Sequence, residues 1–126
     1  MNRFRITPFV LLFALLFGAA PVFAASAIQQ MAEIVMHLNH YPSDAEKNTL
    51  RGIADNASAT AGERALAAAL ISMEHKVGGA DKQKLQELIK SDATPVGERT
   101  LAEVLIGINH KPSSGDVQKL RQLAGQ

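Results

Sequence analysis

Histidine is the residue whose type and spacing most invite a chemical role in this chain. His37 and His40 stand three residues apart, a separation that brings two side chains to one face of a helix. Imidazole is the commonest metal ligand in proteins, so this pair could chelate a metal ion, with Asp44 or Glu33 as a further ligand. The first hypothesis is therefore a metal or small-ligand site formed by His37 and His40.

A second pattern gives histidine a structural role instead. His40, His75 and His110 follow one another at a spacing of 35 residues, each expected at a helix end, where imidazole can donate to free carbonyl groups. Equivalent positions in stacked helices lie about 8–10 Å apart, whereas imidazoles sharing a metal need bonds of about 2 Å each. We therefore expect His75 and His110 to be structural residues at joints between copies. We do not expect the three histidines to converge on one ion.

The elements that must position these histidines are copies of one unit. Residues 62–91 and 97–126 align without a gap, and a more diverged first copy begins near Ile28. Internal repetition with a period of about 20 to 50 residues is typical of repeat folds. A single domain at 25–126 is expected, with copies at about 28–61, 62–96 and 97–126.

Each copy combines a long amphipathic segment with a shorter one. In the third copy the long segment has apolar residues at i, i+3, i+4 and i+7, the spacing of one helix face: Leu101, Val104, Leu105 and Ile108. The short segment has one apolar pair, Leu120 and Leu123. Because a lone hairpin cannot bury its apolar stripe, neighbouring copies must cover it. The sequence predicts an all-α fold, a right-handed-type stack (a short α-solenoid) of three helical hairpins with a 35-residue period.

Capping residues mark where the predicted helices begin. Thr94 before Pro95 predicts a hydroxyl cap followed by proline at the first helical position. Three capping boxes, in which a hydroxyl residue precedes a carboxylate by three positions, are formed by Ser43 and Glu46, Thr60 and Glu63, and Ser113 and Asp116.

Two acidic–basic pairs occupy the same place in the second and third copies. They are Glu63–Arg64 and Glu98–Arg99, and the first copy has no counterpart. Since only the copy without a predecessor lacks the pair, we interpret it as a joint between copies. The glutamate favours a helix N-terminus, and the arginine is expected to reach a carbonyl or carboxylate of the preceding copy.

One stretch of the chain has a familiar order of residues. From Leu85 to Leu105 it contains, in sequence, Leu88, Ile89, Asp92, Pro95, Val96, Arg99 and Ala102. This stretch resembles a HEAT-like or armadillo-like helical repeat, in which a short helix leads through an Asp/Pro turn into a second helix. The resemblance implies that the protein binds other proteins or peptides on an extended surface.

The first 24 residues have the organisation of a secretory signal peptide. Arg3 and Arg5 precede an unbroken apolar run at 9–17, and residues 22–24 (Val-Phe-Ala) offer small side chains at the positions that a signal peptidase reads. A membrane-spanning helix needs about 20 apolar residues, so we expect no membrane insertion after cleavage. The predicted location is periplasmic or secreted.

Composition narrows the remaining function classes. The chain has 13 Lys and Arg, 12 Asp and Glu, and no cysteine, and it shows no basic face for nucleic acid. Phosphate-loop and nucleophile-elbow contexts are also missing, so we expect no enzyme and no cofactor. The leading hypothesis is an exported protein that binds another protein or peptide as an adaptor, chaperone-like helper, or inhibitor or immunity protein. Tyr41 is the candidate residue for contact with the partner, and the sequence is also compatible with a homodimer.

Overall fold

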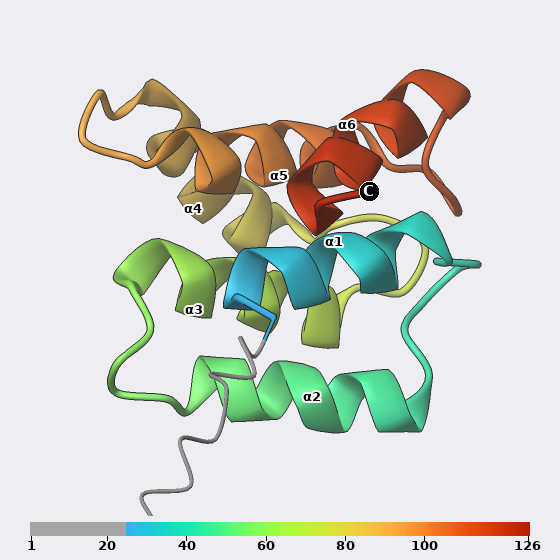
Figure 1. Cartoon of the computed structure of the whole chain (residues 1–126), viewed down its shortest axis with the longest axis horizontal. Helices are drawn as coiled ribbons and strands as arrows, with labels where there is room; N and C mark the ends of the chain where they lie inside the picture. Colours follow the sequence, from blue (N-terminus) through green and yellow to red (C-terminus); the bar gives the residue numbers. More distant parts are fainter. Residues whose placement is uncertain (1–24) are drawn as a thin grey trace, which may run out of the picture.

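The computed structural model describes residues 25–126, and the predicted signal peptide at 1–24 lies outside the described residues. The described part is all-helical, as predicted, and contains no strand. Within it, no helix has both the length and the apolar character that crossing a membrane requires. The six helices are α1 (Ala27–Met36), α2 (Asp44–Ala54), α3 (Ala61–Ser72), α4 (Gly79–Lys90), α5 (Val96–Gly107) and α6 (Ser114–Ala124), shown in Figure 1.

Side-chain caps fix the start of most helices. Ser43, Thr60 and Ser113 each form the predicted capping box, and Ser26 forms a further one with Gln29 at α1. The prediction of a Thr94 cap is wrong. Pro95 is the N-cap of α5 because its backbone is extended, at φ −55° and ψ 146°, and no side chain caps this helix.

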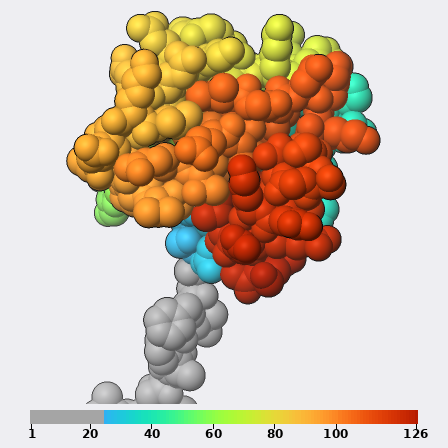
Figure 2. Space-filling view, turned by 90° about the horizontal axis from the view of Figure 1, so that it is seen from above, coloured from blue at the N-terminus to red at the C-terminus, as the bar shows by residue number. Residues whose placement is uncertain are grey.

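The helices pack in a closed arrangement. The predicted difference in helix length is wrong, because α1 has 10 residues and α2 has 11, and α3 and α4 have 12 each. The first helices of the copies (α1, α3 and α5, predicted as the long helices) contact one another. Each second helix (predicted as a short helix) packs on the first helix of another copy: α2 on α3, α4 on α5, and α6 on α1. Figure 1 shows α6, in red, beside α1, in blue. Seen from above, in Figure 2, red and orange residues of the third copy form much of the surface, and little of the blue first helix is visible beside them.

This closure differs from the expected side-by-side stack of hairpins. A row would separate the first copy from the third and expose an apolar face at each end, at a cost in hydration free energy. Here Met31 of α1 and Leu120 of α6 are both fully buried. The two ends of the repeat array therefore cover each other within one chain.

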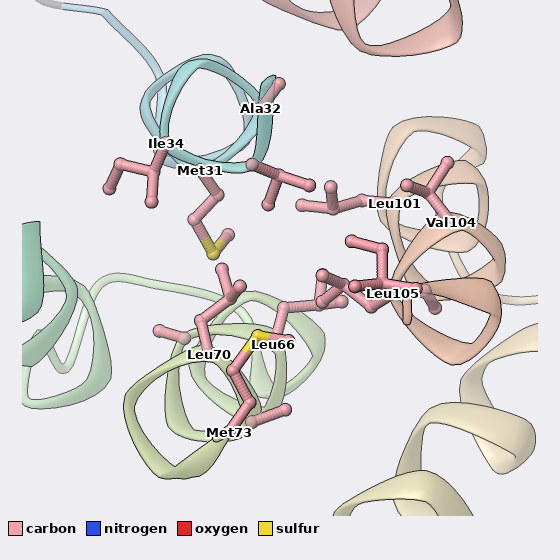
Figure 3. Packing of buried hydrophobic residues seen from close by; sticks show 14 of the residues in the cluster. Met31, Ala32, Ile34, Leu66, Leu70, Met73, Leu101, Val104 and Leu105 are labelled. Carbon is pink, nitrogen blue, oxygen red and sulfur yellow. The ribbon is translucent and has the colours of Figure 1, made fainter. Parts of the chain in front are cut away.

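The core consists of equivalent residues from the three copies. Met31, Leu66 and Leu101 come from α1, α3 and α5, and all three are completely inaccessible to solvent. Figure 3 shows them converging with Leu70 and Leu105 in the space between the three long helices. Each long helix is therefore held by the other two, which fixes where the turns that follow them begin.

Candidate functional site

The turn after each long helix is anchored by a buried apolar residue. Leu38, Met73 and Ile108 follow α1, α3 and α5, and each is at most 5% exposed. A histidine comes two residues after each anchor. Because the three long helices contact one another, the anchors bring the three turns to one end of the molecule.

Backbone hydrogen bonds join these turns directly. The N–H of His40 donates to the carbonyl of His110 at 2.7 Å, and the N–H of His110 donates to the carbonyl of His75 at 2.8 Å. His40 and His110 have φ values of 74° and 69°, in the left-handed region that side chains rarely adopt. Such a conformation costs roughly 1–3 kcal/mol and is maintained only by surrounding structure.

The three imidazoles lie together. Ring centroids are 4.9 Å apart for His40 and His110, 5.3 Å for His40 and His75, and 4.8 Å for His75 and His110. One ligand nitrogen from each ring lies within 4.8 Å of the other two. His40 is half-buried, whereas His75 and His110 are exposed, so the cluster opens to solvent.

The expectation that these histidines lie too far apart to share an ion is therefore wrong. It assumed copies in a row, whereas the closed arrangement brings all three turns to one place. The expected helix-end role is also wrong for them, because His40, His75 and His110 lie in the turns beyond α1, α3 and α5. His75 and His110 do join copies, but through their backbone groups.

One of the three rings is hydrogen-bonded to a neighbouring side chain. The Nδ1 atom of His40 lies 2.9 Å from Oδ1 of Asn39. In the tautomer with the proton on Nδ1, the ring donates to this oxygen and Nε2 keeps its lone pair. Metal-binding histidines are commonly oriented in this way through their second nitrogen.

His37 lies outside this cluster. It is the C-cap of α1, and its Nδ1 is hydrogen-bonded to the carbonyl of Glu33 at 2.9 Å. In residues 25–126 the one group of three or more clustered metal-ligand side chains is His40, His75 and His110. His37 and His40 are thus not brought together with Glu33 or Asp44 as the sequence hypothesis required.

The geometry suits a metal ion with one coordination position left open. Tetrahedral bonds of about 2 Å place ligand atoms about 3.3 Å apart, so nitrogens that lie within 4.8 Å of one another need to approach by at most about 1.5 Å. Two of the rings are exposed and can rotate to do so. Each histidine also follows the C-terminal end of a long helix, whose partial negative charge favours a bound cation.

The predicted joint residues connect the copies in two ways. Arg99 donates through Nη2 to the carbonyls of Ser91, at 2.9 Å, and Thr94, at 3.3 Å. Glu98, only 4% exposed, accepts a hydrogen bond of 2.5 Å from the hydroxyl of Thr60. Both therefore tie the start of α5 to preceding copies. No signal for the Glu98–Thr60 pair was present in the spacing of the sequence.

Their counterparts in the second copy act more locally. Glu63 accepts from the backbone N–H of Thr60 at 2.9 Å, within its own capping box. Arg64 is exposed, and among residues 25–126 its side chain makes no hydrogen bond of the kind made by Arg99. Pro95 accounts for the difference at the glutamates. Proline has no backbone N–H, so Pro95 cannot donate to Glu98 as the N–H of Thr60 donates to Glu63, and Glu98 instead accepts from the Thr60 hydroxyl.

Tyr41 lies beside the histidine cluster. Its side chain is 57% exposed, and the ammonium of Lys47 lies 5.5 Å from the centre of its ring. Both residues line an open cavity of about 290 Å³ together with Met73, Glu74 and His75.

Comparison with known proteins adds no assignment. No protein-family model matches the chain, and neither does a curated protein or a solved structure. The resemblance to HEAT-like and armadillo-like repeats stays an expectation from the sequence.

Proposed function

We propose that this protein binds a divalent transition-metal ion through His40, His75 and His110. The observation that carries the proposal is the convergence of three imidazoles, one from each copy, with ligand nitrogens within 4.8 Å of one another. The hydrogen bond between Nδ1 of His40 and Asn39 supports it further, because it orients the His40 ring.

The donor set indicates which ions suit the site. Imidazole nitrogen favours zinc, copper and nickel over calcium and magnesium, which prefer oxygen ligands. The chain has no cysteine to add a thiolate. Since the cluster opens to solvent, the bound ion would exchange with its surroundings, as expected of a metal-binding protein of the periplasm or the secreted fraction.

Metal titration of the demetallated protein tests this function. Native mass spectrometry with zinc, copper or nickel should show a one-to-one adduct at low micromolar metal. His75→Ala should abolish the adduct, because two remaining imidazoles bind far more weakly than three. His37→Ala is the matched control and should retain it, since His37 lies outside the cluster. Equal adducts in the wild type and the His75→Ala variant would refute the proposal.

A second candidate is binding of another protein or peptide. It is favoured by two large apolar side chains left on the surface, Tyr41 and Val96, which are 57% and 76% exposed. Aromatic side chains in particular are enriched at binding hot spots. Crosslinking of the exported protein in its native compartment should capture a stoichiometric partner, and Tyr41→Ala should reduce the yield. Capture that is unchanged by Tyr41→Ala would argue against this surface.

A further inference from the structure

We infer that the bound metal ion and the cavity beside it together hold a carboxylate ligand that has a small apolar body. The inference rests on the proposed metal site and identifies the class of ligand that would fill the open coordination position of its ion. Three protein ligands leave a fourth position of a tetrahedral ion open to an exogenous group. The cavity beside His75 determines which group fits there.

The cavity lies between the first and second copies. It is lined by Tyr41 and Lys47 of the first copy and by Met73, Glu74 and His75 of the second. His75 therefore belongs to both the cavity and the metal cluster. The cavity volume of about 290 Å³ is enough for a ligand of one ring or a short chain, and too small for a folded partner protein.

The charges of the cavity make anion binding depend on the metal. Lys47 supplies one positive charge and Glu74 one negative charge, so the lining itself has no net attraction for an anion. A divalent ion at the histidines adds two positive charges next to the cavity. A carboxylate should therefore bind to the metal-loaded protein and only weakly to the metal-free one.

The residues that line the cavity would contact the ligand's carboxylate and its apolar body. The ammonium of Lys47 lies 5.5 Å from the ring centre of Tyr41. In this cavity its positive charge would attract a carboxylate bound to the metal ion. The face of Tyr41, which is 57% exposed, provides apolar surface for the ligand's body. Glu74, which is exposed and outside the three-residue metal cluster, lines the same cavity and would repel a carboxylate.

The test uses the whole exported chain loaded with cobalt(II), whose visible spectrum reports its ligands. Cobalt binding is first measured alone. Benzoate is then added as the free carboxylate, and N-acetylphenylalanine as a model of a protein's C-terminal carboxylate. Benzoate should change the cobalt spectrum with saturation, and the metal-free protein should show no comparable binding. If the cobalt spectrum changes with N-acetylphenylalanine but not with benzoate, the cavity binds the C-terminus of another protein, and the small-ligand assignment is overturned.

Matched variants separate the cavity from the metal. Lys47→Met should weaken benzoate binding about three- to fivefold, the effect of one partly exposed charge pair, while leaving cobalt affinity unchanged. Glu74→Gln should strengthen it, again without altering cobalt affinity. Lys82→Met, at the corresponding position of the second copy, is the control and should change neither.

The possible failures are distinguishable. If cobalt does not bind, the proposed function fails and the inference fails with it. If cobalt binds but benzoate leaves its spectrum unchanged, or if Lys47→Met behaves like Lys82→Met, the metal site stands and the carboxylate site is refuted. Loss of cobalt affinity in Glu74→Gln would show that Glu74 itself fills the open position, which also overturns the inference.

Discussion

His40 and His110 contact each other in two ways: a backbone hydrogen bond of 2.7 Å joins them, and their rings pack edge to face with centroids 4.9 Å apart. They belong to the first and the third copy, which an open row of hairpins would keep apart. Both also have left-handed backbone conformations. A ligand bound by these two side chains would therefore link the beginning of the repeat array to its end.

Metal should stabilise the fold because it binds residues from all three copies. A ligand at one hundred times its dissociation constant adds about 2.7 kcal/mol to the free energy of unfolding, which corresponds to roughly 10–20 °C in a domain of this size. Thermal unfolding followed by circular dichroism, with and without zinc, measures the shift. His110→Ala should abolish it and His37→Ala should retain it. An equal shift in both variants would place the metal elsewhere.

The left-handed turns allow metal binding and backbone stability to be separated. His40→Asn should leave the free energy of unfolding within about 0.5 kcal/mol of wild type, because asparagine tolerates this conformation, yet it should lose the metal. His40→Val should cost about 1–2 kcal/mol, since a β-branched residue is strained there. Urea denaturation of the metal-free proteins compares them.

His75 provides the control for that comparison. It is not among the non-glycine residues with positive φ in the described chain, so His75→Val should cost clearly less than His40→Val. Equal costs at the two positions would show that backbone conformation does not govern the effect.

Local features of the fold could be predicted from the sequence, but the way the copies close could not. The spacing of Leu101, Val104 and Leu105 predicts a helix, and Ser43 and Ser113 predict where two others begin. The same apolar spacing serves an open row and a closed arrangement equally well, so it does not reveal that α6 packs on α1.

The residues of the proposed metal site could not be predicted from the sequence for the same reason. The sequence shows that His40, His75 and His110 are equivalent, but their separation depends on closure and on the path of the turns. His37 and His40 are close in sequence, but α1 ends at Met36 with His37 as its C-cap, so His40 lies beyond the helix and the two do not share a helix face. One sequence signal could have favoured convergence: the same residue type recurring at the same point of every copy.

The contact between Gly62 and Glu98 predicts an unusually sensitive glycine. A Cβ atom at position 62 would clash with Oε2 of Glu98, and Glu98 is buried and bonded to Thr60. Gly62→Ala should therefore lower the free energy of unfolding by about 1–3 kcal/mol, although alanine favours helices. Gly52→Ala, where nothing lies within 4 Å, should instead stabilise the protein by up to about 1 kcal/mol.

A double-mutant cycle identifies the cause of that loss. In the Glu98→Ala background the clash is absent, so Gly62→Ala should cost much less than it does in the wild type. Urea denaturation of the four proteins gives the coupling energy. A cost that is independent of residue 98 would mean that the glycine is needed for another reason.

Closure of the fold is tested at three equivalent leucines. Leu50, Leu85 and Leu120 occupy the same position in the three short helices, and each is completely buried. In an open row, the last short helix would have one neighbour fewer, and truncating Leu120 would cost less than truncating the others. In the closed arrangement α6 packs on α1 as α2 packs on α3, so each Leu→Ala substitution should cost about 2–5 kcal/mol. Urea denaturation of the three variants decides between the two arrangements, because a markedly smaller loss at Leu120 alone is what an open row requires.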